Sequence, residues 1–153
     1  MSIGTVFVNN RTQAVRLPLD VRLPEGVWDA VNVLGADRID HGVRAIEDAA
    51  LVRMLVDRQI PLGICPTSNL VLGVYPSILD HPIERLRSAG VRVSVNTDDP
   101  ALLGASLIGE YALCRRTFGW TDAMTKSVAQ TSIDASFANV DVKAQLLAAL
   151  KNW

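Results

Sequence analysis

The stretch VRVSVNTDDP, residues 91–100, carries the pattern that decides the fold: a short apolar run that ends in a cluster of polar side chains. The pattern occurs twice more upstream, in RIDHG at residues 38–42 and in IPLGICPTSN at residues 60–69. Near-continuous apolar runs such as 60–65 and 91–95 are typical of strands that are buried on both faces of a parallel sheet. The three stretches therefore predict three β-strands, each followed by polar residues.

Amphipathic segments between these runs predict helices. We expect helices at about residues 24–34, 47–58 and 81–89, and three more after the last strand, at about 106–118, 121–137 and 142–150. Pro24 near a helix start, and Gly35 and Gly90 just beyond helix ends, follow the usual preferences for helix termini. Residues 66–75 are expected to form a loop. Because strands alternate with helices, the fold class is α/β, built from parallel βα units.

The first 23 residues differ from the rest of the chain. They have no helical periodicity, and Pro18 disfavours a central strand, so we expect one short strand near Thr5–Val8. Residues 1–23 are therefore treated as an unassigned N-terminal segment, and residues 24–153 as one domain.

Composition narrows the class of protein. The chain has 153 residues, is 49% hydrophobic and has a formal net charge of −1, which fits a compact domain and gives no electrostatic reason to expect nucleic acid as a partner. No apolar run is long enough for a membrane span, and the N-terminus lacks the basic-then-apolar order of a signal peptide. The two cysteines form no disulfide framework. We therefore expect a cytoplasmic protein without membrane partners.

The polar clusters follow strand ends, where ligands bind in parallel α/β folds. In their order and spacing, RIDHG, CPTSN and SVNTDDP resemble the last three strand-end motifs of the adenosine/adenine deaminase family, over roughly residues 24–138. This resemblance implies that residues 24–153 are the C-terminal part of a (β/α)8, TIM-type barrel, followed by extra C-terminal helices. It also implies a hydrolase that uses Zn²⁺ to remove the C6 amino group of a purine nucleoside or base.

The resemblance also implies roles for three residues. Asp98 would be a zinc ligand, Asp99 would accept a hydrogen bond from the purine ring, and His41 would orient and help to deprotonate the zinc-bound water. Zinc lowers the pKa of bound water to near 7, and an imidazole can accept a proton near neutral pH. Two adjacent carboxylates repel each other unless they serve different partners, which favours such a division of roles.

The sequence departs from the family pattern in its histidines. It contains two, His41 and His81, and has neither the His-x-His pair nor the His-Ala-Gly-Glu stretch that supply the family's other zinc ligands and its general acid. We therefore expect a fragment or truncated member of the family that is inactive alone and associates with itself or with a complementing chain. The alternative is a non-catalytic, self-associating half-barrel, or a frameshifted product without a metal site.

Several points stay open at this stage. Whether the family member acts on adenosine or adenine is not decided by these motifs, and neither is the question of whether the isolated chain is an enzyme. Thr67, Ser68 and Asn69 either line a pocket or satisfy backbone groups of the loop. His81, which precedes Pro82 at an expected helix start, is taken as a surface or capping residue.

Overall fold

The structure is a computed structural model that describes residues 5–9, 12–16 and 24–153. It divides into two compact units, one formed by Met1–Ile64 and Pro82–Val93, the other by Cys65–His81 and Ser94–Trp153. The expected boundary between an N-terminal segment and a domain at residues 23 and 24 falls partly outside the described residues and stays a prediction.

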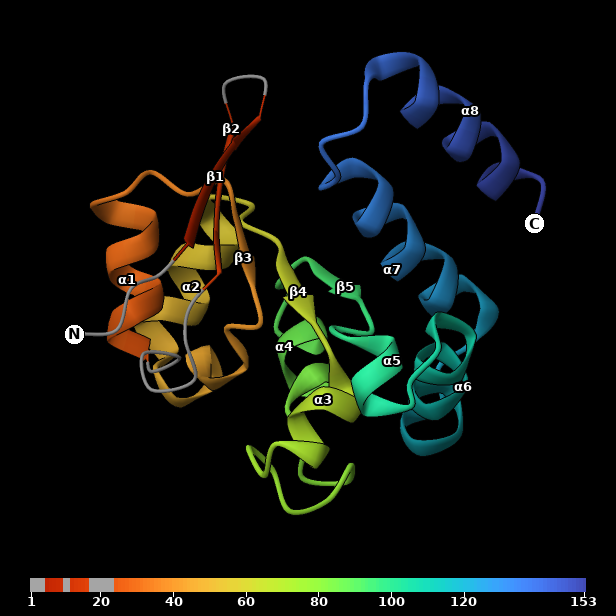
Figure 1. Cartoon of the computed structure of the whole chain (residues 1–153), viewed down its shortest axis with the longest axis horizontal. Helices are drawn as coiled ribbons and strands as arrows, with labels where there is room; N and C mark the ends of the chain where they lie inside the picture. Colours follow the sequence, from red (N-terminus) through yellow and green to blue (C-terminus); the bar gives the residue numbers. More distant parts are fainter. Residues whose placement is uncertain (1–4, 10–11, 17–23) are drawn as a thin grey trace. The chain divides into compact units, whose positions relative to one another are not determined.

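The strands form one sheet in the order β1-β2-β3-β4-β5. β1 (Thr5–Asn9) and β2 (Thr12–Arg16) are an antiparallel hairpin in which Asn9 pairs with Thr12. β2 runs parallel to β3 (Arg38–Asp40), and β3 runs parallel to β4 (Leu62–Ile64); Figure 1 labels these strands. β5 covers Val93–Val95. The predicted strands and their parallel pairing are confirmed, whereas β2, which has no clear pattern of its own, was not predicted.

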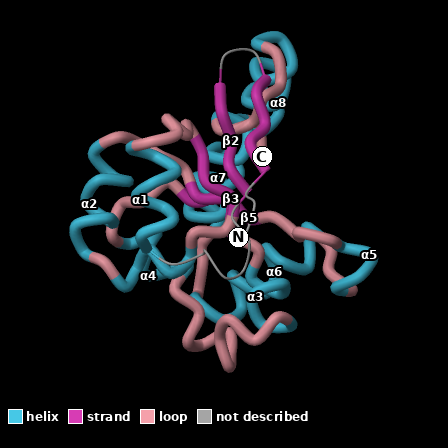
Figure 2. The backbone as a smooth tube through the Cα atoms, turned by 60° about the vertical axis from the view of Figure 1, so that its left-hand side comes forward, coloured by secondary structure: helices cyan, strands magenta, loops and turns pink. Residues whose placement is uncertain are grey.

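The helices of the first unit are α1 (Pro24–Asn32), the 3-10 helix η2 (Val43–Glu47), α2 (Ala49–Asp57) and α4 (Ile83–Ser88). Helices α1 and α2 lie on the same side of β1 to β3 (Figures 1 and 2). α1, α2 and α4 all contact η2. The core is made of aliphatic side chains with no exposed surface, namely Val27, Ile39, Leu51, Leu55, Leu62, Ile83 and Leu86. Burial of this apolar surface holds the helices against the strands.

Asp48 joins two of these helices. One carboxylate oxygen caps α2 by accepting the Ala50 N–H at 2.8 Å, and the other accepts the Trp28 indole N–H from α1, also at 2.8 Å. The hydrogen bond from Trp28 is the main reason that the pKa of Asp48 lies below its ordinary value. A single aspartate thus begins α2 and fixes α1 beside it.

The second unit consists of helices. They are α3 (Pro66–Val71), α5 (Pro100–Leu103), α6 (Leu107–Phe118), α7 (Asp122–Asp134) and α8 (Val140–Lys151). The expectation of a loop over residues 66–75 was wrong for its first six residues, because Pro66 begins a helix rather than preventing one. The helix expected to end near residue 137 ends at Asp134.

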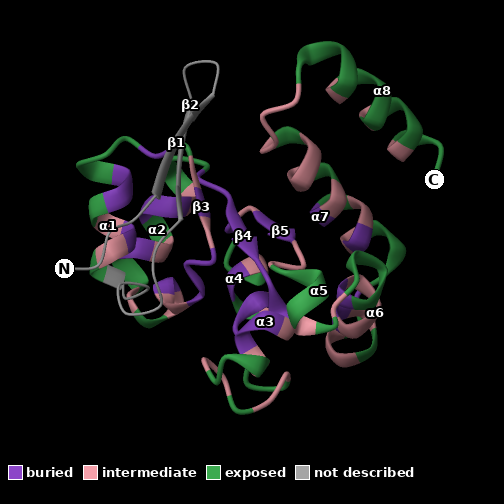
Figure 3. Ribbon diagram, in the orientation of Figure 1, coloured by how far each residue is buried: buried purple, intermediate pink, exposed green. Residues whose placement is uncertain are grey.

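Helix α8 packs on α7 but buries none of its own residues, and it is drawn in exposed and intermediate colours in Figure 3. Two lysines connect the helices: Lys143 donates to the Asp134 carbonyl at 2.8 Å, and Lys126 donates to the Lys151 carbonyl at 3.0 Å. A cavity of about 480 Å³ lies among α6, α7 and α8. Apolar side chains such as Tyr111, Leu150 and Trp153 line it, so it reflects open packing of α8 rather than a polar site.

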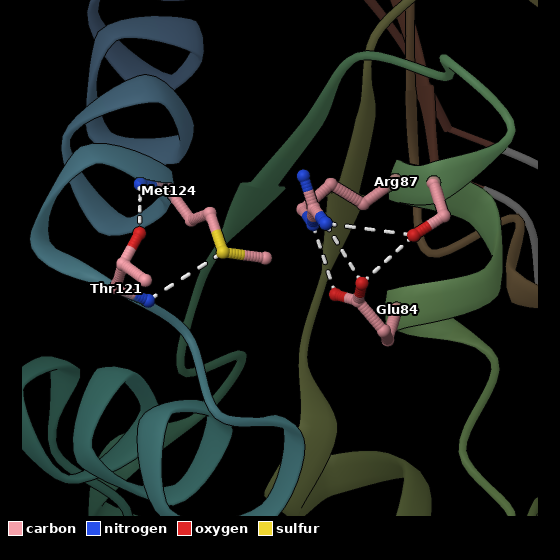
Figure 4. A network of polar contacts seen from close by, with 5 residues as sticks. Glu84, Arg87, Thr121 and Met124 are labelled. Carbon is pink, nitrogen blue, oxygen red and sulfur yellow. Dashed lines mark hydrogen bonds and ion pairs between the residues drawn. The ribbon is translucent and has the colours of Figure 1, made fainter.

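Short-range polar contacts support individual helices, and Figure 4 shows two sets of them. On α4, Arg87 forms an ion pair with Glu84 at 2.7 Å, one turn away. At the start of α7, the Thr121 hydroxyl accepts the Met124 N–H at 3.3 Å and so caps the helix. Among the described residues, no helix is long and apolar enough to cross a membrane.

Candidate functional site

The first predicted site residue, His41, directly follows β3. Its side chain is 1% exposed, and its backbone N–H donates to the Gly63 carbonyl on β4 at 2.6 Å. His41 has φ 72°, and the next residue, Gly42, has φ 64°. Two successive left-handed residues turn the chain sharply out of the sheet, so the imidazole is fixed at the end of β3.

The second, Asp98, lies three residues beyond β5. It has φ 62° and is partly exposed. Its Oδ2 accepts a hydrogen bond from the Ser68 hydroxyl at 2.7 Å, and Ser68 itself is completely buried on α3. The polar residues that follow β4 and β5 are therefore joined by a direct side-chain contact within the second unit.

Backbone strain singles out both residues. In the part of the chain that the structure describes, three non-glycine residues have positive φ: His41, Gln59 and Asp98. Gln59 sits just beyond the end of α2, where left-handed residues are common. Strained backbone at the other two positions costs on the order of 1–3 kcal/mol each and is typical of functional sites. That observation supports the choice of these two residues and does not by itself give their roles.

The third, Asp99, is exposed and caps α5: its Oδ1 accepts the Leu102 N–H at 3.1 Å. The neighbouring carboxylates thus serve different partners, Asp98 the Ser68 hydroxyl and Asp99 a helix N-terminus. The division expected from charge repulsion, in which Asp98 binds a metal and Asp99 a purine, stays a prediction. The capping contact does not test whether Asp99 binds a purine.

Glu110 was missed by sequence reasoning. It is completely buried on α6, and its Oε2 accepts the Thr67 N–H of α3 at 3.2 Å, while its Oε1 is buried without a hydrogen-bond partner. Burial raises the pKa of the Glu110 carboxyl, and the hydrogen bonds from Thr67 oppose that rise. The sequence places Glu110 four residues before Cys114, one turn away on the same face of an expected helix. In the structure both residues are completely buried.

His81 is not the surface residue expected from the sequence. It is 2% exposed, its Nε2 lies 3.0 Å from the Asn69 Oδ1, and its ring packs against Tyr75 with centroids 5.2 Å apart. Burial lowers the pKa of His81 to about 4, so the ring is neutral at neutral pH and Nε2 is the donor to Asn69. The sequence left the roles of residues 67–69 undecided. In the structure each makes a polar contact inside the second unit, Thr67 with Glu110, Ser68 with Asp98 and Asn69 with His81.

The described residues do not form a complete metal site. No group of three or more His, Cys, Asp or Glu side chains among them is placed to hold a metal ion. His41 belongs to the first unit, and Asp98 and Asp99 belong to the second.

Comparison with known proteins assigns the chain. Residues 20–153 match the family model described as adenosine deaminase. The chain belongs to the adenosine deaminase family. It is 44% identical over 127 residues to an adenine deaminase from Agrobacterium fabrum, a match that covers 83% of this chain and 39% of that protein.

Solved structures of similar proteins agree with this family assignment. The crystal structure of an adenine deaminase from Arthrobacter aurescens matches with a TM-score of 0.82 and 34% identity, over 86% of this chain and 40% of that one. An amidohydrolase from Burkhoderia ambifaria, solved with bound Zn, matches with a TM-score of 0.80 and 26% identity, over 91% of this chain and 39% of that one. The fold is therefore that of the C-terminal βα units of a TIM-type deaminase barrel, as predicted. The chain spans about two fifths of the length of the relatives it matches.

Proposed function

We propose that this chain carries the aspartate-bearing part of a purine deaminase site, which removes the C6 amino group of adenine or adenosine by hydrolysis, and that residues outside this sequence complete the site. The observation that carries the proposal is Asp98: a strained aspartate beyond β5, bound by the buried Ser68. The 44% identity to an adenine deaminase supports the choice of substrate class.

The chain's own donors do not fit a complete zinc site. A catalytic zinc is held by about three protein ligands and keeps one open position. The sequence has two histidines, and one of them, His81, is buried in a contact with Asn69. Asp98 would supply one ligand, so at least two more have to come from elsewhere. We therefore derive no catalytic step through the metal, and we propose that the isolated chain is inactive.

The remaining two roles belong to the same proposal. Asp99 would accept a hydrogen bond from a purine ring N–H, and its contact with the Leu102 N–H would keep the carboxylate in one orientation. His41 would orient the attacking water and receive its proton. The left-handed backbone at His41 and Gly42 supports this role, because it holds the imidazole at the carboxyl end of β3.

The test combines zinc analysis with complementation. The purified chain is dialysed against a chelator and then against zinc. Its metal content and its ammonia release from adenine and adenosine are then measured with and without the part of the Agrobacterium fabrum adenine deaminase that this chain does not match. We expect well under one zinc per chain and no ammonia alone, and about one zinc and measurable deamination in the mixture. In the mixture, Asp98→Ala should abolish both, whereas Asp80→Ala, a change outside the site, should abolish neither.

Two results would overturn the proposal. Stoichiometric zinc and turnover by the chain alone would show that its own residues complete the site. A stable mixture that neither binds zinc nor releases ammonia would instead favour the second candidate, a non-catalytic half-barrel module. The absence of a three-ligand cluster among the described residues is the observation that keeps this candidate in view.

A further inference from the structure

Helix α3 begins without a cap of its own. The residue at its N-cap position, Cys65, makes no side-chain capping hydrogen bond, and the helix is six residues long. So short a helix is marginal in isolation. The N–H groups of its first turn have no partner within the helix, and few turns offset the cost of nucleation. Something outside α3 has to hold its start in place.

Glu110 provides that contact. Its carboxylate reaches from α6, 43 residues along the chain, to accept the Thr67 N–H at 3.2 Å. Glu110 is in turn fixed at the first turn of α6, where the Ser106 hydroxyl accepts the Gly109 N–H at 3.1 Å. A carboxylate at the amino end of a helix is favourable, because the helix dipole is positive there.

The residue after Thr67 is Ser68, and it contacts the candidate site. Ser68 is completely buried, and its hydroxyl donates to the Asp98 Oδ2 at 2.7 Å. Thr67 and Ser68 are consecutive residues in the first turn of the same helix, so a shift of the Thr67 backbone moves the Ser68 hydroxyl as well. Glu110 and Asp98 are thereby coupled through two hydrogen bonds and one peptide link.

Local capping alone does not account for a glutamate at this position. An asparagine or serine at residue 65, a position that is itself 4% exposed, would cap α3 without burying a charge. The chain instead places a carboxylate with no exposed surface, one of whose oxygens has no hydrogen-bond partner. Burying a polar group in this way is costly, which indicates a function beyond starting one short helix.

We propose that Glu110 is a positioning residue for Asp98: it fixes the first turn of α3, and through Ser68 it sets the orientation of the Asp98 carboxylate. This inference rests on the proposed function, in which Asp98 is a metal ligand. Residues that hydrogen-bond to metal-ligating carboxylates commonly affect metal affinity, since a misdirected carboxylate oxygen cannot coordinate the metal.

The experiment follows the Asp98 carboxyl carbon by NMR in the full chain, free of metal, with ¹³C-labelled aspartate and Asp98→Asn to assign the signal. Glu110→Ala should move this signal in the same direction as Ser68→Ala does. Glu110→Gln, whose amide oxygen still accepts from Thr67, should leave it near its wild-type position. The double change Glu110→Ala with Ser68→Ala should match Ser68→Ala alone, because both act on one contact.

Two further measurements separate positioning from general loosening. Exchange of the Thr67 amide hydrogen should quicken about 10- to 100-fold in Glu110→Ala, as expected for loss of a hydrogen bond to a charged group. Thr125→Val is the matched control in the same unit and should leave the Asp98 signal unchanged. It removes the part-buried hydrogen bond that Arg115 donates to the Thr125 hydroxyl and the one that this hydroxyl donates to the Thr121 carbonyl. If Glu110→Ala does not fold, Glu110→Asp, one methylene shorter, replaces it in the same comparison with Glu110→Gln.

An Asp98 signal that stays in place in Glu110→Ala but moves in Ser68→Ala would overturn the proposal, and so would shifts that add in the double variant. These results involve neither zinc nor turnover. A failure of complementation therefore refutes the proposed function and leaves the coupling measurable, whereas a failed coupling refutes the role of Glu110 alone.

Discussion

Gly42, the residue after His41, provides the sharpest test of how the end of β3 is built. It has φ +64°, and a Cβ at this position would lie 3.1 Å from the Ile39 Cγ2 and 3.2 Å from the Leu62 Cδ2. Both neighbours are completely buried and cannot easily move away. For Gly42→Ala, the left-handed conformation costs about 1–2 kcal/mol and overpacking adds about 1–3 kcal/mol. We expect the free energy of unfolding to fall by about 2–5 kcal/mol.

Gly35→Ala is the matched control in the same unit. Gly35 has φ +65°, and a Cβ there would meet no atom within 4 Å. Its loss should therefore be the conformational cost alone, about 1–2 kcal/mol. Urea unfolding followed by circular dichroism measures both variants, and their difference isolates packing against β3 and β4. Equal losses in the two variants would refute the packing argument.

Three further predictions concern stability. Gln59→Gly should raise the free energy of unfolding by about 0.5–1 kcal/mol in urea titrations, because glycine removes the strain of φ 56° just beyond α2. An unchanged midpoint would mean that this gain is offset by loss of the hydrogen bond from the Gln59 side chain to the Val56 carbonyl. Burial lowers the pKa of His81 to about 4, so the unfolded chain takes up a proton at His81 before the folded chain does as the pH falls below about 6.5. The free energy of unfolding should therefore drop by about 2 kcal/mol between pH 7.5 and 5, and His81→Gln should reduce that drop. The pKa of Asp48 is lowered chiefly by the hydrogen bond from Trp28, so Asp48 stabilises the fold above its ordinary pKa of 3.8 and loses this effect at lower pH. The free energy of unfolding of Asp48→Asn should therefore fall less steeply with acid than that of the wild type.

The sequence was informative where a residue's identity decides its structure. The apolar runs predicted β3, β4 and β5 with parallel pairing, and the order of the polar clusters led to the correct family. Gly42, the last residue of the predicted strand-end stretch RIDHG, takes the left-handed conformation that glycine adopts readily. Such features depend on neighbours in the chain, which a reader of the sequence can see.

Contacts between distant residues were not predictable in this way. The start of α3 depends on Glu110, which lies 43 residues away, so residues 66–71 looked like a loop. His81 looked like a surface residue because its partner Asn69 belongs to that same misjudged segment. In both cases the missing information was which buried polar group meets which, and a single sequence does not contain it.

The division into two units has a consequence for the path of the chain. The backbone leaves the first unit after Ile64, returns at Pro82 and leaves again after Val93, so each unit is assembled from separate stretches of sequence. Neither unit corresponds to a continuous stretch that could be expressed by simple truncation. Isolating the first unit requires Ile64 to be rejoined to Pro82 by an engineered loop. Closing this short loop would cost only slightly less entropy than closing the natural segment 65–81, because the entropy cost of loop closure grows slowly with loop length. An exchanged gene segment that crosses Ile64, His81 or Val93 would accordingly alter both units at once.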